Sequence, residues 1–340
     1  MVMGGVAVTR SQILPAWGRI LGGYRPFLSI EITKECPLHC PGCYAYEPTH
    51  LGGTTLRQLT DLRGDALVAG VLALVRRCRP LHLSIVGGEP LVRTAELSLL
   101  LPKLNLLPAT DRLNVEVQLV TSAVRPIPSE WAGYKCLHIV ISVDGLAAEH
   151  DRRRFPATYD RILRHITGHQ VIVHCTVTRN LLGQDYLRDF ASFWSRRPEV
   201  YAIWFSLYTP QRGDRSEERL APSDRLLAVQ QLADVAAEFP KVYLPKLLLA
   251  GLRRPPASPA ECIFAQSTTC VSADLQTRIV PCQFGGDPVC DECGCMASAG
   301  FASIGNYRLA GILPISRIFS ISSRIGDFAA HRESTARSSR

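Results

Sequence analysis

Three cysteines in one short loop constrain this chain more than any other feature. Cys36, Cys40 and Cys43 follow directly after the apolar, β-branched run at residues 27–33. The C-x3-C-x2-C spacing lets three thiolates converge on one face of a cubane iron–sulfur cluster, which normally takes four thiolates. Three thiolates leave one iron open to a substrate or cofactor. Zinc is the competing interpretation, but closed structural zinc sites use four ligands, usually as two short pairs.

The remaining composition predicts a folded protein of one large or two modest domains. The chain has 340 residues, 46% of them hydrophobic, and twelve cysteines that cluster at metal-like spacings. Such clustering in a long chain favours a reducing, cytoplasmic location over a disulfide-stabilised secreted protein. We see no apolar run long enough to span a bilayer and no signal peptide. The net charge of +8 is spread along the chain, which favours a solvated basic surface over a nucleic-acid interface.

Alternating apolar runs predict a parallel α/β sheet. Helical stretches near 64–79, 94–106, 157–167 and 183–197 separate the strand-like runs. Six such β/α units predict a partial (β/α)6 barrel of the TIM type, with a small C-terminal cysteine-rich domain. The expected strands are residues 27–33, 81–86, 114–121, 137–143, 170–178 and 201–208.

The polar candidate residues fall where these strands end. The cysteine loop follows the first strand, and Gly87-Gly88-Glu89-Pro90 follows the second. Ser142 and Asp144 end the fourth strand, and Asn180 follows the fifth. Because such barrels place their chemistry at the carboxyl ends of the strands, we expect these residues on one rim.

The cysteine spacing, the aromatic Tyr44 after the third cysteine, and the Gly-Gly-Glu-Pro stretch together resemble the radical S-adenosylmethionine (radical SAM) enzymes. The resemblance covers about residues 27–210, and more loosely 262–295. It implies that the three cysteines hold a [4Fe-4S] cluster whose open iron chelates S-adenosylmethionine. Reductive cleavage of this cofactor would yield a 5′-deoxyadenosyl radical. The resemblance assigns Gly87, Gly88 and Glu89 to the methionine amino group.

Other rim residues are weaker candidates. In the family a serine at the position of Ser142 often contacts the cofactor, and Asp144 is expected to hold a turn or orient a neighbour. Asn180 is either a ligand contact or a loop cap. The basic run at residues 152–154 is expected to be a solvated loop, with binding of an anionic substrate as the alternative.

A second group of cysteines lies in residues 262–295. A hairpin between Cys270 and Cys282, with its turn near residues 274–277, would bring its end cysteines together, and a tight loop would add further thiolates. This region resembles the twitch or SPASM extension, which carries auxiliary iron–sulfur clusters, although Thr277 replaces the expected glycine. We expect one auxiliary [4Fe-4S] cluster, with structural zinc as the alternative. The expected ligands are Cys270, Cys282, Cys290 and either Cys293 or Cys295; Cys262 belongs to the same region.

These inferences predict a radical SAM enzyme. The expected organisation is an N-terminal segment (1–26), the barrel (27–215), a helical connector (216–260), the auxiliary-cluster region (261–300) and a tail (301–340) with a disordered end. A peptide is the first expectation for the substrate, and a small molecule or lipid precursor is the second. The expected electron donor is a flavodoxin or ferredoxin. The rival from another class is a zinc- or cluster-stabilised module that binds nucleic acid.

Overall fold

A computed structural model describes residues 18–105, 115–156 and 159–305 without interruption, together with short pieces outside these ranges. These pieces include two small antiparallel pairs, β1 (Val2–Met3) with β2 (Val6–Ala7) and β10 (Arg308–Leu309) with β11 (Leu313–Pro314). The predicted disordered end, residues 331–340, lies outside the described residues, as does most of the apolar stretch near 309–320.

A curved sheet of seven strands organises the chain, in the order β8-β7-β6-β5-β4-β3-β9. All neighbouring strands are parallel. This confirms the predicted partial barrel and the six expected strands. The strands are β3 (Phe27–Glu31), β4 (His82–Val86), β5 (Glu116–Thr121), β6 (Leu137–Ser142), β7 (Val171–Val177), β8 (Val200–Leu207) and β9 (Thr268–Val271).

The seventh strand, β9, was not expected. It comes from the cysteine-rich region and pairs in parallel with β3, so that Ser29 lies opposite Cys270. The turn that follows it matches the predicted hairpin, because Ile279 N donates to Cys270 O at 3.0 Å and Ser272 N donates to Thr277 O at 2.8 Å. The cysteine-rich region therefore completes the sheet beside the strand that carries the cysteine loop.

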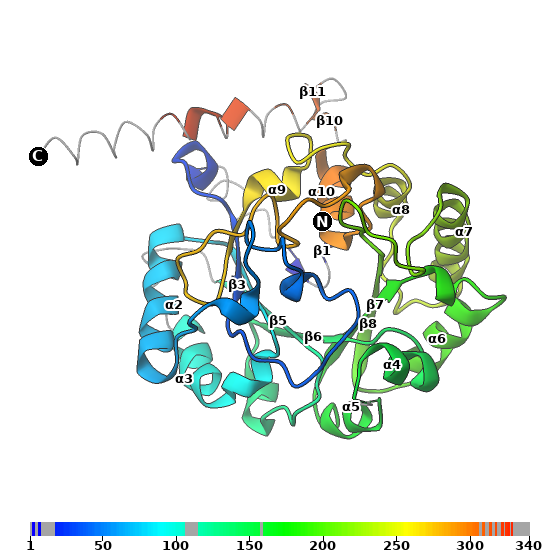
Figure 1. The fold of residues 1–340 in the computed structure, drawn as a ribbon, viewed down its shortest axis with the longest axis horizontal. Helices are drawn as coiled ribbons and strands as arrows, with labels where there is room; N and C mark the ends of the chain where they lie inside the picture. Colours follow the sequence, from blue (N-terminus) through cyan, green and yellow to red (C-terminus); the bar gives the residue numbers. More distant parts are fainter. Residues whose placement is uncertain are drawn as a thin grey trace, which may run out of the picture.

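Helices cover the outside of the sheet (Figure 1). The four helical stretches predicted between strands appear as α2, α3, α5 and α6, the expected helical connector contains α7 and α8, and α4, α9 and α10 were not predicted. They are α2 (Gly64–Cys78), α3 (Thr94–Asn105), α4 (Ala147–Arg153), α5 (Tyr159–His165), α6 (Tyr186–Ser195), α7 (Pro222–Glu238), α8 (Lys246–Arg253), α9 (Ile263–Ser267) and α10 (Met296–Gly305). In the described part of the chain, no helix has the length and apolarity needed to cross a bilayer.

Apolar side chains alternate between the two faces of the sheet along each strand, and they form an apolar layer on each face. Residues such as Leu83, Val117 and Ile139 face the helices and belong to the main core. A smaller cluster around Val140 and Ile172 is formed by the strand residues that alternate with the first set. Because successive strand residues point to opposite faces, this second set lies on the inner face of the curved sheet.

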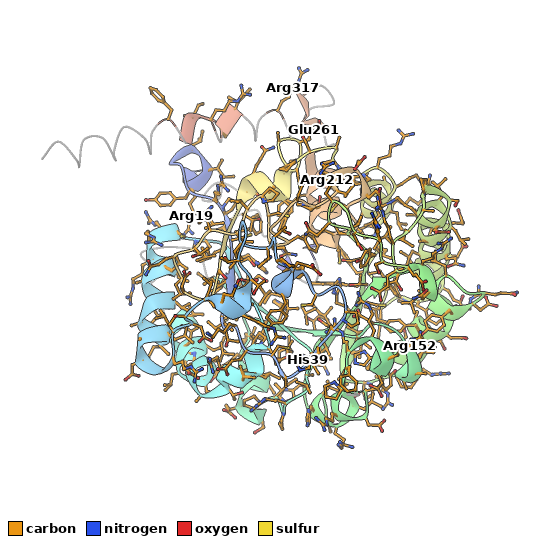
Figure 2. All side chains as sticks on the ribbon, in the orientation of Figure 1. Arg19, His39, Arg152, Arg212, Glu261 and Arg317 are labelled. Atoms are coloured by element: carbon orange, nitrogen blue, oxygen red, sulfur yellow. The ribbon has the colours of Figure 1, made fainter. Side chains whose placement is uncertain are left out.

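The cysteine loop lies across the mouth of the barrel. His39, labelled in Figure 2, lies on this loop in front of the sheet, and its backbone N–H donates to the carbonyl oxygen of Phe155 at 2.7 Å. Phe155 follows α4, on the opposite side of the mouth from β3. The loop therefore spans the carboxyl edge of the sheet, where the candidate residues were expected.

Candidate functional site

The three loop cysteines are close, half-buried free thiols. Burial raises the pKa of Cys36 to about 12, and the charges of Cys40 and Cys43 add to this effect. Burial also raises the pKa of Cys43 to about 11, again with a contribution from Cys40. Each thiolate would thus be costly unless nearby positive charge stabilised it. Iron supplies such charge, so these thiols fit an iron–sulfur cluster.

The loop thiols are compatible with a cluster. Among the residues that the structure describes, no three His, Cys, Asp or Glu side chains are arranged to hold a single metal ion. In a cubane cluster each thiolate ligates a different iron, so the sulfurs need not converge on one point. Zinc stays the competing interpretation of the loop.

The Gly-Gly stretch fixes the start of the cysteine loop. Gly88 N donates to Thr33 O at 2.9 Å, and Glu89 N donates to Glu35 O at 2.7 Å. A methyl group on Gly88 would lie 2.6 Å from the carbonyl carbon of Glu35, and Gly87 adopts a φ of +110°. The glycines are thus required because two backbone segments touch. The close approach at Gly88 is to Glu35, the residue before Cys36.

Glu89 is buried, and its carboxylate is already saturated. Its oxygens accept bonds from Leu91 N at 2.9 Å, from Ser122 N at 2.8 Å, from the Ser122 hydroxyl at 2.5 Å, and from the Thr121 hydroxyl. Four donors match the acceptor capacity of an ionised carboxylate. This side chain, predicted to bind cofactor, connects the β4 loop to the end of β5.

Two arginines that sequence analysis set aside lie at the site. Asp144 is buried and forms ion pairs with Arg153 and with Arg154, the latter at 2.8 Å. Burial opposes the charge on Asp144, but the two guanidinium groups outweigh it and hold the pKa of this carboxyl well below its usual range. The expectation of a solvated loop is wrong for both arginines, whose side chains are only 15% and 18% exposed.

Arg154 also acts on the cysteine loop. Burial raises the pKa of Cys40, and the positive charge of Arg154 opposes that rise. A buried guanidinium beside a future thiolate stabilises the negative charge that a cluster site accumulates. The signal in the sequence was the position of the basic run directly after the fourth strand, at the rim.

The remaining predicted cofactor residues lie at separate strand ends. Ser142 ends β6, half-buried, and pairs in register with His174 of β7. Asn180 lies exposed on the short 3-10 helix η6 (Arg179–Leu181), which follows β7. Tyr208 follows β8 and donates from its hydroxyl to Asp214 at 2.7 Å, and a methyl group on Gly42 of the cysteine loop would lie 3.4 Å from this hydroxyl oxygen. The mouth of the barrel is therefore lined by polar groups from successive strands.

A buried polar junction joins the cysteine loop to the C-terminal region. The imidazole Nε2 of His50 lies 2.9 Å from Glu31, and its Nδ1 lies 2.9 Å from the carbonyl oxygen of Phe284. The Ser272 hydroxyl donates to the other oxygen of Glu31 at 2.6 Å. The ring of Tyr44 stacks edge-on against Phe284, with a centroid separation of 5.3 Å. The residue directly after Cys43 thus contacts the segment that carries Cys282.

Five C-terminal cysteines line one narrow, mainly apolar cavity. They are Cys262, Cys282, Cys290, Cys293 and Cys295. Burial raises the pKa of Cys282, Cys293 and Cys295, and it raises that of Cys290 to about 11. Like the loop thiols, these sulfurs are outside any disulfide and burial disfavours their thiolate forms, so they too fit a metal cluster.

The structure changes the expected membership of this second group. Cys270 lies on β9 and is not among the residues that line the cavity, although its charge acts on Cys282. Cys262, which was not chosen as a ligand, lines the cavity from the start of α9 and lies 3.3 Å from the hydroxyl of Ser298. Sequence spacing favoured the hairpin cysteines, and Cys270 lies on β9, in register with Ser29 of β3.

Comparisons with known proteins agree with this geometry. The family model of the radical SAM superfamily matches residues 30–181. A search of curated proteins gave no match. The structure of anSMEcpe with bound AdoMet is similar, with a TM-score of 0.55 at 16% identity over 80% of each chain.

Two structures with peptides are also similar. The structure of anSMEcpe with bound AdoMet and Kp18Cys peptide has a TM-score of 0.54 at 17% identity, over 80% of this chain and 79% of that chain. The structure of Streptococcus suis SuiB bound to precursor peptide SuiA has a TM-score of 0.56 at 14% identity, over 88% of this chain and 72% of that chain. At these identities the likeness shows a shared fold.

Proposed function

We propose that this chain, whose residues 30–181 match the family model of the radical SAM superfamily, is an enzyme of that class. Cys36, Cys40 and Cys43 are proposed to hold a [4Fe-4S] cluster that cleaves S-adenosylmethionine. The observation that carries the proposal is the group of three neighbouring, half-buried free thiols at the barrel mouth. When bound, the cluster and cofactor supply a 5′-deoxyadenosyl radical that abstracts a substrate hydrogen.

The chain's own residues position and shield this chemistry. Gly87 and Gly88 hold the cysteine loop through backbone contacts, and their carbonyl groups are the proposed acceptors for the cofactor's ammonium group. Arg154 stabilises negative charge at Cys40. Ser142 and Asn180 are proposed to contact the rest of the cofactor from the ends of β6 and β7.

We further propose one auxiliary [4Fe-4S] cluster in the C-terminal cavity. The cavity favours Cys262, Cys282, Cys290 and Cys293 as ligands, with Cys295 as the alternative to Cys293. Its mainly apolar lining suits a buried cluster, and structural zinc is the alternative occupant. The contact between Tyr44 and Phe284 connects the two cysteine groups.

A peptide is the proposed substrate. The support is the similarity to anSMEcpe and SuiB, whose structures contain peptides. A flavodoxin or ferredoxin is the proposed electron donor, and the net charge of +8 would attract an acidic donor.

The test is anaerobic reconstitution followed by iron and sulfide analysis, EPR of the reduced protein with and without S-adenosylmethionine, and assay of 5′-deoxyadenosine. About eight irons per chain and one EPR signal that changes with cofactor are expected for two four-iron clusters. The variant with Cys36, Cys40 and Cys43 all replaced by Ala should lose about half the iron and all 5′-deoxyadenosine formation.

The matched control is Cys78→Ala, because Cys78 is a half-buried thiol on α2, outside both cysteine groups. It should keep full iron content and activity. Unchanged iron in the triple variant would contradict the assignment of the catalytic cluster. Four irons per chain, still responsive to cofactor, would leave the catalytic site intact and assign the C-terminal cysteines to zinc or to packing.

A further inference from the structure

A cavity of about 370 Å³ opens beside the cysteine loop. Lys34 and Cys36 line it from the loop, and Arg57 from the 3-10 helix η2 (Leu56–Gln58). Val92 lines it from the 3-10 helix η3 (Pro90–Arg93), and Arg125 from the segment after β5. Its volume lies within the range of small-molecule sites, about 300–1,000 Å³. The cavity therefore offers a binding space directly beside a proposed cluster ligand.

The cavity has one carboxylate, and arginines already neutralise it. Glu35 pairs with Arg63, and its other oxygen lies 3.2 Å from Arg93. Arg93 also lies 2.8 Å from the buried Asp61, so both nearby carboxylates have cationic partners. Little negative charge remains to balance further cations at the cavity wall.

Three further cationic side chains line the cavity. Within the described part of the chain, none of the three forms an ion pair. The guanidinium of Arg57 lies 4.0 Å from the ring centroid of Tyr46, which fixes its position but satisfies none of its N–H donors. Lys34 donates one N–H to Leu59 O at 2.6 Å, which leaves two donors. Arg125 is exposed at the opposite wall. An anion in the cavity would meet charge-assisted donors from three segments.

We propose that this cavity binds an oxyanion group of the substrate, a phosphate or a carboxylate, and holds it beside the catalytic cluster. The inference rests on the proposed function and defines the class of substrate. The residues predicted for the cofactor do not line the cavity, namely Gly87, Gly88, Glu89, Ser142 and Asn180. A phosphorylated small molecule and an acidic peptide both carry the required group.

The test measures binding separately from turnover. The full-length, anaerobically reconstituted enzyme is saturated with S-adenosylmethionine and titrated in a calorimeter with inorganic pyrophosphate or with triglutamate peptide. We expect saturable binding of at least one probe. Arg57→Gln and Arg125→Gln should each weaken it by about tenfold or more, the usual effect of removing a charge-assisted hydrogen bond. Binding of pyrophosphate alone identifies a phosphorylated substrate, whereas binding of triglutamate identifies an acidic peptide.

The matched control is Arg161→Gln, because Arg161 is an exposed arginine on α5, outside the cavity. It should bind the probes as the unaltered enzyme does. The proposal is overturned if neither probe binds to the enzyme saturated with S-adenosylmethionine, or if the two cavity variants bind the probes as tightly as the control. An enzyme that forms 5′-deoxyadenosine but binds neither probe refutes the cavity alone. A chain that binds a probe but never cleaves the cofactor refutes the proposed function.

Discussion

Replacing Gly88 by Ala should loosen the cysteine loop. The new methyl group would lie 2.6 Å from the carbonyl carbon of Glu35 and 2.8 Å from the hydroxyl oxygen of Tyr46. Real methyl groups essentially never approach another heavy atom closer than 3.0 Å, and the carbonyl oxygen of Glu35 would lie nearer still, so the two segments must separate. That movement strains two backbone hydrogen bonds, Gly88 N to Thr33 O and Glu89 N to Glu35 O.

The expected magnitude follows from those two bonds. A buried backbone hydrogen bond contributes about 0.5–1.5 kcal/mol net, so the loss of both would cost about 1–3 kcal/mol of unfolding free energy. Because Glu35 directly precedes Cys36, the displaced loop should also bind less iron and less S-adenosylmethionine. Urea unfolding, iron analysis and cofactor titration under anaerobic conditions measure these three effects.

Gly133→Ala is the matched control. An added methyl group there would meet no atom within 4 Å, and the backbone conformation is ordinary for other residues. This variant should change stability by less than about 0.5 kcal/mol. Wild-type stability and iron content in Gly88→Ala would refute the argument that backbone contact requires the glycine. Normal iron with weakened cofactor binding would instead show that Gly88 acts on the cofactor alone.

Three further predictions concern buried charge and the second cysteine group. Asp144→Asn leaves the buried guanidinium of Arg154 without its carboxylate, whereas Arg153 keeps its ion pair with Glu218, and should cost about 3–5 kcal/mol in urea unfolding. Because the pKa of Asp144 is lowered in the folded state, the contribution of its carboxylate to the free energy of unfolding is present above pH ~4. This contribution should fade as the pH drops further in the wild type, and the variant should show no such loss. Burial disfavours the charged form of His50, but Glu31 favours that form more strongly, so the pKa of His50 is raised. The contribution of protonated His50 to the free energy of unfolding should be complete below pH ~6.5 and decline as the pH rises. A His50→Gln variant whose pH–stability curve matched the wild type would contradict this. Cys262→Ala should remove iron from the auxiliary site while Cys270→Ala retains it, and the reverse pattern would restore the ligand set expected from the sequence.

The barrel and the placement of the cysteine loop were predictable from local patterns. Alternating apolar runs separated by helical stretches specified six strands, and parallel strands must present their carboxyl ends at one edge. The motif after the first strand therefore had to meet the motif after the second. In the structure, the two segments meet through the hydrogen bond from Gly88 N to Thr33 O.

The missed features depend on contacts between distant segments. The sequence of a strand as short as β9 does not distinguish the edge strand of a large sheet from one strand of an isolated hairpin. Only the pairing of β9 with β3 identifies it as an edge strand of the barrel sheet. The polar partners of Glu89 come from the next strand end, which sequence spacing alone does not specify. The burial of Arg153 and Arg154 follows from Asp144, since an isolated basic run is usually solvated.

The pairing of β3 with β9 has a consequence for synthesis of the chain. The strand that carries the cysteine loop gains one of its neighbours only from residues 268–271, and the bond between Glu31 and Ser272 spans 241 positions. Contacts of such high sequence separation form late, because a long loop must close before they contribute. While the ribosome is still making the middle of the chain, one edge of β3 remains unpaired. Insertion of a metal cluster at the mouth of the barrel would therefore be a step that follows completion of the polypeptide.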